Sequence, residues 1–379
     1  MEIHGKIDEQ FAPIKEVFAQ NFTDYADVGA SFAVSLEGEI VCDIWGGHLD
    51  EERTRPWQED TIVNVFSSTK TMSFLCALIL ADRGMLDFYE PVTTYWPEFG
   101  QNGKENVEVR HLMSHSAGLS GMDKDFSGVA LYDWDAVCVA LAEQAPWWEP
   151  GTASGYHAFT QGHLIGEVVR RISGKSIGTF FADEIAGPLG ADFHIGTKET
   201  HWPRIGNLIP PVANPADQAM DADPDSIAAR TFRNPKPQAE DSWTAGWRLA
   251  EIPAANGHGN ARSIVRAQTP LANGGSAFGV DLLSAAGVAR IFDEQSHGED
   301  LVLGVPIRFG MGYGLSSPDL PMGPNENIAW WGGWGGSTVV VDTDAHMCVS
   351  YVMNKMGEGT LGDPRGFNLQ AAAYECLLR

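Results

Sequence analysis

The chain is poor in cysteine, in basic residues and in long apolar segments. Its 379 residues include five cysteines, and 25 lysines and arginines stand against 50 aspartates and glutamates, for a net charge of -25. So strong a negative charge disfavours nucleic acid and anionic membrane surfaces as partners. There is no run of about 18 apolar residues and no apolar signal segment at the start. We therefore expect a cytoplasmic protein without a membrane span or a nucleic-acid partner.

The cysteines are odd in number and widely spaced, and most have apolar neighbours. They are Cys42, Cys76, Cys138, Cys348 and Cys376. This distribution favours reduced core thiols over a disulfide framework. No cysteine and histidine cluster has zinc spacing, so we expect neither a metal nor a cofactor.

Two β-hairpins are predicted, one near each end of the chain. Residues 30–36 and 40–45 flank one turn signal, and residues 337–342 and 347–353 flank another. We expect the two hairpins to share one antiparallel sheet, covered by a helix over residues 367–378.

The sequence predicts two domains. Residues 1–66 and 265–379 form an α/β sheet domain, with an amphipathic helix over residues 6–22, and residues 67–264 form a mostly helical domain. Within the helical domain, residues 201–262 read as irregular because prolines break any periodicity. So long an irregular segment predicts a functional surface that borders the active site.

Ser67 and Lys70 are spaced to meet on one face of a helix. The S-x-x-K pattern alone more often marks a helix start with a solvated lysine. Here, however, an apolar run over residues 74–80 ends at Gly84 and predicts a buried helix, in which a charged lysine is unfavourable. A desolvated lysine can lose its proton and then accept the proton of a serine nucleophile. The pattern therefore indicates acyl transfer.

Two later segments offer the remaining parts of such a site. The turn-rich loop over residues 149–156 places Tyr156 before a predicted helix, and beside a lysine its phenol could ionise below its usual pKa of about 10. The glycine- and tryptophan-rich residues 330–337 precede a β-branched strand, whose N–H groups could reach a substrate carbonyl. Taken singly, each segment could be ordinary packing.

Three motifs, taken in their order along the chain, resemble those of the serine β-lactamase-like family, and in particular of its family VIII carboxylesterases. They are Ser67-x-x-Lys70, Pro150-Gly151-Thr152 with Tyr156, and Trp331-Gly332-Gly333. The resemblance spans roughly residues 30–355, and residues 109–119 are also similar to a structural segment of that superfamily. It implies an α+β or α/β fold of the class C β-lactamase and penicillin-binding-protein kind, an antiparallel sheet flanked by helices plus a mostly helical lobe.

The resemblance also implies roles for individual residues. Ser67 is the nucleophile, Lys70 and Tyr156 share the general-base role, and the N–H groups of Ser67 and Trp334 form the oxyanion hole. The sequence does not fix which of Lys70 and Tyr156 holds the proton at rest. The expected substrate-binding residues are Trp331, Gly332, Gly333, His157 and Trp148.

The sequence departs from the β-lactamase pattern at two places. His157-Ala158 follows the tyrosine where β-lactamases have an asparagine at the second position, and Trp331-Gly332-Gly333 stands where they have Lys-Thr-Gly. The first change removes an amide that contacts a substrate amide, and the second removes the cation that meets a carboxylate. Both changes favour an uncharged ester over a lactam.

Residues 174–178 fit a second pattern, the G-x-S-x-G nucleophile elbow around Ser176. That elbow needs a strand before it, whereas residues 164–172 have apolar positions at helical spacing. We interpret Gly174 as the end of that helix and Ser176 as the start of the next.

The sequence thus predicts a serine carboxylesterase that hydrolyses small, short-chain acyl esters through an acyl-enzyme. An amidase or D-peptidase, a weak β-lactamase and an acyltransferase of the same fold remain alternatives. A non-catalytic protein that binds a small ligand is the alternative of a different class. The natural ester and the oligomeric state are open.

Overall fold

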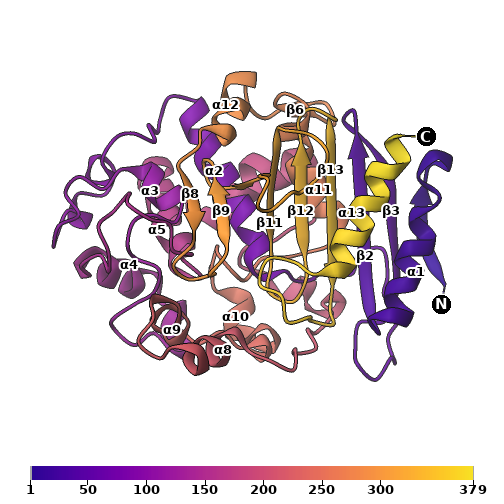
Figure 1. The fold of residues 1–379 in the computed structure, drawn as a ribbon, viewed down its shortest axis with the longest axis horizontal. Helices are drawn as coiled ribbons and strands as arrows, with labels where there is room; N and C mark the ends of the chain where they lie inside the picture. The colour runs from indigo at the N-terminus through magenta and orange to yellow at the C-terminus, as the bar shows by residue number, and fades with distance from the viewer. Residues whose placement is uncertain (1, 379) are drawn as a thin grey trace.

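Strands from both ends of the chain meet in one antiparallel sheet (Figure 1). In this computed structural model, which describes residues 2–378, the sheet has nine strands in the order β1-β3-β2-β13-β12-β11-β10-β9-β8. They are β1 (Ile3–Ile7), β2 (Gly29–Leu36), β3 (Glu39–Gly47), β8 (Ser296–Glu299), β9 (Pro306–Phe309), β10 (Gly314–Leu315), β11 (Ile328–Gly332), β12 (Thr338–Asp342) and β13 (Met347–Met353). The two ends join where Val34 of β2 pairs with Val349 of β13. Both predicted hairpins and their shared sheet are confirmed.

Helices cover both faces of this sheet. α1 (Ile14–Asp24) and α13 (Pro364–Leu377) lie over one face (Figure 1), and α11 (Ala261–Ala272) packs against the other. On the α11 side, Ser35 Oγ lies 2.7 Å from Thr269 Oγ1. Every residue of β12 and β13 is buried. Because helices cover both faces of the sheet, side chains on both faces of these strands are buried, and their sequences are continuously apolar rather than alternating between apolar and polar residues.

The N-terminal segment differs from the prediction. A helix was expected over residues 6–22, but Ile3–Ile7 pairs with β3 as the edge strand β1, and α1 begins only at Ile14, after Pro13. The pairing partner of β1 is distant in sequence, so the periodicity of the segment itself did not reveal it.

The C-terminal helix predicted over residues 367–378 is confirmed as α13. It begins three residues earlier because the side chain of Asp363 accepts the N–H of Arg365 and Pro364 occupies the first helical position.

The segment between β3 and β8 is mostly helical. Its helices are α2 (Lys70–Asp82), α3 (Val109–Met113), α4 (Trp134–Glu143), α5 (Thr160–Ser173), α6 (Ile177–Phe181), α7 (Gly187–Leu189), α8 (Pro215–Ala222), α9 (Ile227–Arg233), α10 (Ala245–Leu249), α11 and α12 (Ala285–Ala289). Two short antiparallel pairs lie outside the main sheet: β4 (Val63–Asn64) pairs with the distant β5 (His258–Gly259), and β6 (Ser276–Ala277) forms a hairpin with β7 (Val280–Asp281). The central helix is α2, which is buried over residues 70–80. It ends shortly before Gly84, whose backbone φ is 69°. No helix in the described part of the chain is long and apolar enough to cross a membrane.

The proline-rich residues 201–262 contain three short helices, α8, α9 and α10, that the sequence did not predict. Each begins directly after a residue whose side chain accepts a backbone N–H, namely Asn214, Ser226 and Thr244. Pro215 starts α8 rather than breaking it, because proline suits the first helical position. The expectation of a wholly irregular segment was therefore wrong.

The domain boundary expected between residues 264 and 265 falls inside α11. This helix packs against β2, β12 and β13. We therefore propose that the second sheet segment starts at Ala261, and the division into two domains otherwise stays a prediction.

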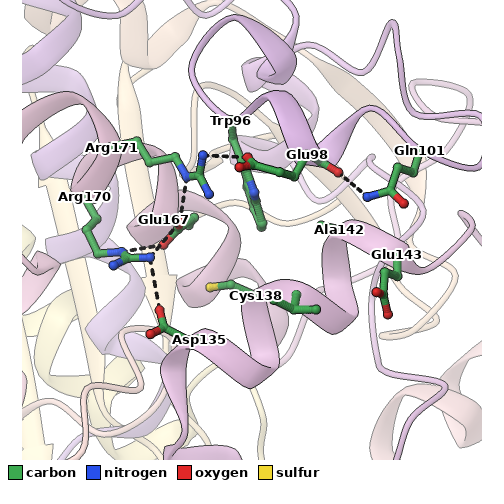
Figure 2. Close-up of a pocket in the computed structure, with 11 residues that line it drawn as sticks. Trp96, Glu98, Gln101, Asp135, Cys138, Ala142, Glu143, Glu167, Arg170 and Arg171 are labelled. Atoms are coloured by element: carbon green, nitrogen blue, oxygen red, sulfur yellow. Dashed lines mark hydrogen bonds and ion pairs between the residues drawn. The ribbon is translucent and has the colours of Figure 1, made fainter.

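Ion pairs join α4, α5 and the turn that carries Glu98 (Figure 2). Arg170 and Arg171 each donate to the buried Glu167 carboxylate at 2.7 Å, and Arg171 also donates to Glu98 at 2.6 Å. Although burial opposes it, hydrogen bonds from both arginines lower the pKa of Glu167. This network fixes α5, the helix that follows the Tyr156 loop.

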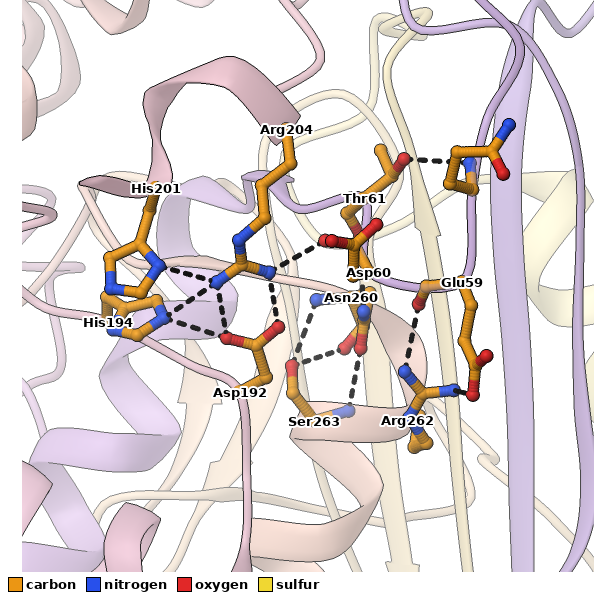
Figure 3. Close-up of polar contacts among 11 residues, drawn as sticks. Glu59, Asp60, Thr61, Asp192, His194, His201, Arg204, Asn260, Arg262 and Ser263 are labelled. Atoms are coloured by element: carbon orange, nitrogen blue, oxygen red, sulfur yellow. Dashed lines mark hydrogen bonds and ion pairs between the residues drawn. The ribbon is translucent and has the colours of Figure 1, made fainter. Parts of the chain in front are cut away.

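A second polar network joins the helical segment to the sheet layer (Figure 3). Arg204 donates to Asp192 at 2.7 Å, and Arg262 at the start of α11 donates to the Glu59 carbonyl at 2.9 Å. Although burial opposes it, hydrogen bonding with His194 and Arg204 lowers the pKa of Asp192. Within residues 2–378, no three His, Cys, Asp or Glu side chains are arranged to hold a metal ion.

A buried ion-pair cluster ties α13 to the start of the sheet. The Arg365 guanidinium pairs with the carboxylates of Asp27 and Asp363, which are themselves buried, and donates to the Gly335 carbonyl at 2.9 Å. Gly335 lies in the turn between β11 and β12. The cluster therefore supports both the helix and that turn.

We expect Arg365→Met to lower the free energy of unfolding by about 3–5 kcal/mol, because it leaves the buried Asp27 carboxylate without its cation and with only the Tyr351 hydroxyl as a hydrogen-bond donor. Urea unfolding at pH 7 measures the change. Arg308→Met is the matched control, since Arg308 forms a half-exposed pair with Glu294 and its loss should cost about 1 kcal/mol or less. Equal losses in the two variants would contradict the structural role of the cluster.

Candidate active site

Ser67 lies in a single 3₁₀ turn, Phe66–Thr69, that leads directly into α2. Its side chain is 8% exposed, which makes it accessible from one side only. Phe66, just before it, has a φ of 42°. The left-handed region is unfavourable for a bulky residue, and such strain persists only where the surroundings hold it.

Contacts from two distant segments hold this strained turn. The Val65 N–H donates to the Gly257 carbonyl at 2.9 Å, and Ser337 Oγ donates to the Val65 carbonyl at 2.9 Å. Ser337 Oγ also lies 2.9 Å from Ser68 Oγ. The Phe66 ring packs against Trp334 with ring centroids 4.9 Å apart. The nucleophile turn is thus fixed against the strand that follows the glycine-rich segment.

Lys70 is fully buried at the start of α2. Its Nζ lies 2.7 Å from Tyr156 Oη and 3.2 Å from Ser67 Oγ, and it donates to the carbonyls of Ala158 at 2.7 Å and Ala254 at 3.0 Å. All four partners are hydroxyls or carbonyls, and none is a carboxylate. The structure thus brings together the three side chains that the sequence placed in one site.

Burial sets the protonation of this group. It lowers the pKa of Lys70 well below its ordinary value, and it raises the pKa of the Tyr156 phenol. A phenol that ionises below its usual pKa was expected, and this expectation was wrong. Burial disfavours the charged form of both groups, so the lysine gives a phenolate little stabilisation.

Tyr156 is positioned by residues behind it. Its N–H donates to Asp300 Oδ1 at 2.9 Å, and the same oxygen accepts the N–H groups of Val302 and Leu303 at 2.9 Å. The His115 ring packs against the phenol with centroids 5.0 Å apart, and its Nδ1 accepts the N–H of His157 at 2.9 Å. The phenol is therefore held from the sheet side and from the helical side.

The oxyanion hole expected from the backbone N–H groups of Ser67 and Trp334 stays a prediction, which two features of the structure favour. Within residues 2–378 neither has a hydrogen-bond acceptor in the protein. The strand approaches the nucleophile turn closely at Gly333, where a Cβ would lie 2.2 Å from the Val65 carbonyl oxygen. Only glycine permits this approach, which brings the following N–H toward Ser67.

The cavity at Ser67 is small and uncharged. Its volume is about 30 Å³, and every residue that lines it in the described chain is uncharged. Ser67, Tyr156 and Thr360 supply its hydroxyl groups. Its apolar wall includes Phe66, Ala158, Phe159, Phe232, Ala255 and Trp334.

The residues of the Trp-Gly-Gly motif lie in the wall behind this cavity. Trp331 is buried and packs on Tyr156 with ring centroids 5.6 Å apart. Gly332 lies against the backbone of Leu361, where a Cβ would come within 2.3 Å. The motif therefore shapes the site from behind, whereas direct substrate contact was expected.

His157 and Trp148 also lie behind Tyr156 rather than on the cavity surface. Both ring nitrogens of the buried His157 are used, with the Leu119 N–H at 3.2 Å and the Gly155 carbonyl at 2.6 Å, and burial lowers its pKa to about 3. Trp148 packs edge-on against His157 and donates to a backbone carbonyl. Neither residue lines the cavity at Ser67, and their expected part in substrate binding stays a prediction.

Ser176 is not a nucleophile elbow. Gly174 ends α5 at a φ of 72°, and Ser176 caps α6 by accepting the Thr179 N–H. Its hydroxyl donates to Glu251 at 2.7 Å. The predicted helix end and helix start are confirmed.

Three residues important to the site were not predicted from the sequence. Phe66 carries the backbone strain, and His115 and Asp300 hold Tyr156. Asp300 comes from the loop between β8 and β9, far along the chain from the tyrosine. A lone aspartate before an apolar Leu-Val-Leu run gave no signal of this contact.

Comparison with known proteins identifies the family. The family profile described as beta-lactamase matches residues 16–373. The esterase/beta-lactamase LipL of Mycobacterium tuberculosis is 34% identical over 365 residues, which cover 93% of this chain and 83% of LipL. The chain therefore belongs to the beta-lactamase family.

Solved structures give the same result. The crystal structure of a family VIII carboxylesterase is 41% identical, with a TM-score of 0.93 and coverage of 99% of this chain and 100% of the other. A penicillin-binding protein homologue from Caulobacter crescentus is 38% identical, with a TM-score of 0.90 over the same shares. The predicted class C β-lactamase-like fold and the resemblance to family VIII carboxylesterases are confirmed.

We expect Asp300→Ala to lower kcat for a p-nitrophenyl ester about 10- to 100-fold with little change in KM, because the phenol loses its fixed position. Asp300→Asn should retain most activity. One oxygen of Asp300 has no partner within the described residues, and burial raises the pKa of this carboxyl, so a neutral amide can replace it.

Steady-state kinetics measure kcat and KM separately, and circular dichroism checks that each variant is folded. Asp319→Ala serves as a surface control, since Asp319 only pairs with the half-exposed His297. A rise in KM at constant kcat, or equal loss in the Asn and Ala variants, would contradict the positioning role of Asp300.

Proposed function

We propose that this protein is a serine carboxylesterase that hydrolyses small, uncharged esters through an acyl-enzyme on Ser67. The observation that carries the proposal is the fully buried Lys70 amine, within reach of both Ser67 Oγ and Tyr156 Oη and without a carboxylate partner. The family VIII carboxylesterase and LipL, as relatives named for esterase activity, support it. A cytoplasmic location stays a prediction of the sequence.

The neutral Lys70 amine acts as the base for acylation. Its two N–H groups donate to the carbonyls of Ala158 and Ala254. Its lone pair is then free to accept a proton from the hydroxyl of Ser67 or Tyr156. The proton of Ser67 passes to Lys70, directly or through Tyr156, as Oγ attacks the ester carbonyl carbon. The N–H groups of Ser67 and Trp334 stabilise the oxyanion.

The same groups complete the reaction. When the bond between the carbonyl carbon and the alkoxy oxygen breaks, the protonated Lys70 returns the proton to the leaving alcohol through Tyr156. Water then attacks the acyl-enzyme and gives its proton to Lys70. The carboxylic acid leaves as Ser67 recovers its hydrogen.

The cavity wall favours esters over β-lactam antibiotics. Where β-lactamases carry the lysine of Lys-Thr-Gly, the buried Trp331 stands, and no charged residue lines the cavity in the described chain. A substrate carboxylate would therefore lose its hydration without gaining a partner. Weak β-lactam hydrolysis is the second candidate, because the relative LipL is named both an esterase and a beta-lactamase.

We expect hydrolysis of p-nitrophenyl acetate and butyrate, slow or absent cleavage of nitrocefin, and loss of at least about 10³-fold in kcat in Ser67→Ala. Tyr156→Phe should lower kcat by about 10²- to 10⁴-fold, because it removes the hydroxyl between serine and lysine. Initial rates at pH 7.5 measure these effects.

Ser176→Ala is the matched control, because it removes a serine hydroxyl that caps α6 and donates to Glu251 but does not line the cavity at Ser67. We expect nearly unchanged turnover. Loss of activity in Ser176→Ala rather than in Ser67→Ala would overturn the assignment, and faster cleavage of nitrocefin than of esters would favour the second candidate.

The pH dependence tests the protonation of Lys70. An amine with the ordinary pKa of 10.5 would make kcat rise about tenfold per pH unit from pH 7 to 9. Because burial lowers this pKa well below 10.5, the rise of kcat should end at a lower pH and should be shallower than tenfold per unit between pH 7 and 9. The value of kcat should fall at acid pH as the amine takes up a proton.

The dependence of kcat on pH is obtained from ester hydrolysis rates after subtraction of the rate measured with Ser67→Ala. A rise of about tenfold per unit through pH 9 would show that Lys70 keeps an ordinary pKa and is charged at rest, and would contradict the neutral resting amine.

A further inference from the structure

The catalytic cavity is too small for most of an ester. Its volume of about 30 Å³ holds only about two water molecules. The wall opposite Ser67 is formed by Pro215 at the start of α8, Phe232 near the end of α9, and Thr360. A substrate larger than an acetate must therefore extend past these three residues.

A groove of about 690 Å³ lies on the other side of the same wall. Pro215, Phe232 and Thr360 line both spaces, so a single layer of side chains separates the groove from the cavity. A volume of this size is typical of sites that hold small organic molecules. The groove runs between the helices α8 and α9 and the loop over residues 299–304.

The chemistry of the groove suits an uncharged apolar chain. Three alanines, Ala219, Ala222 and Ala228, leave room on the helix side, and Leu301, Val302 and Leu303 form the loop side. Leu301 is exposed to solvent there. The acidic side chains at the groove are Glu299 and Asp300, and no basic residue lines it in the described chain. Free carboxylates are therefore disfavoured, whereas aliphatic chains can bury apolar surface.

The two helices beside the wall differ in how firmly they are held. α9 is bonded to the helical lobe: Thr231 Oγ1 lies 2.6 Å from Ser120 Oγ, and the Arg230 guanidinium lies over Trp147 at 3.9 Å. Hydrogen bonds and ion pairs from α8 reach only residues 233–237 in the described chain, as in the pair of Asp217 with Lys236. Pro215 is therefore the side of the wall that can yield, and Phe232 is the fixed side.

We propose that this groove is a substrate subsite that holds an apolar chain of the ester, and that Pro215 and Phe232 are the specificity-determining wall between it and Ser67. Substrates then include esters with medium-length chains, which pass Phe232 when α8 moves aside. The inference rests on the proposed esterase function and specifies the substrates of the same site.

Two substitutions of opposite effect test the subsite. Ala222→Trp fills the groove from its exposed side, and we expect it to lower the ratio of kcat/KM for the long-chain over the short-chain ester about tenfold. Phe232→Ala removes the fixed side of the wall and should raise that ratio about tenfold. Val212→Trp adds a tryptophan at a fully exposed position outside the groove and should leave both rates unchanged.

Each variant is assayed with two series of esters. In one the acyl chain grows from p-nitrophenyl acetate to octanoate, and in the other the alcohol grows from ethyl to octyl acetate. A response in the first series assigns the groove to the acyl chain, and a response in the second assigns it to the alcohol. An unchanged ratio in both series overturns the subsite.

Wild-type turnover of p-nitrophenyl acetate separates the two proposals, because this ester has no aliphatic chain for the groove to hold. Acetate turnover with chain-length ratios that no variant changes overturns the subsite alone. Absence of turnover for every ester overturns the esterase function and the subsite together.

Discussion

The Lys70 amine is buried without a carboxylate beside it, and this constraint organises the site. An isolated charge is strongly disfavoured in such a place, so the group adopts its neutral form. A neutral amine still needs acceptors for its two N–H groups, and these are the carbonyls of Ala158 and Ala254. Two loops far apart in sequence must therefore converge on the first turn of α2. Their convergence also brings Tyr156 to the lysine and leaves the amine lone pair facing the hydroxyl groups.

This arrangement requires a rigid frame, because the nucleophile turn carries backbone strain at Phe66. The frame comes from the sheet: Ser337, directly before β12, bonds to the Val65 carbonyl. From the opposite side, Arg365 on α13 donates to the carbonyl of Gly335 in the same β11–β12 turn. A chain of contacts thus runs from the buried pair of Arg365 with Asp27 to the Ser67 turn. Strain at a catalytic position persists only where the surrounding structure fixes it in this way.

Features encoded in neighbouring residues could be predicted from the sequence, and features made by distant contacts could not. The hairpins, the meeting of Ser67 with Lys70 and the helix end at Gly174 each depend on spacing or on a local cap, and all three are present. The strand β1 depends on a partner some 40 residues away, and the helix expected over residues 6–22 was wrong in its first part, since α1 begins at Ile14. Asp300 reaches Tyr156 across 144 positions of sequence, and nothing near either residue indicates the pairing. The placement of Trp331 behind the phenol, rather than in the cavity, is likewise a matter of tertiary packing.

The distribution of polarity in the site limits how it can select substrates. Apart from the Thr360 hydroxyl, the side-chain hydrogen-bonding groups of the site are those of Ser67, Lys70 and Tyr156, which in the proposed mechanism act on the ester function that every substrate shares. The remaining wall is uncharged, so discrimination between esters depends on size and shape. In an apolar pocket one methylene changes specificity by only about 10- to 200-fold. Selection by size therefore depends on the helices of the proline-rich region, and changes in that region can alter the accepted ester while the catalytic groups stay in place.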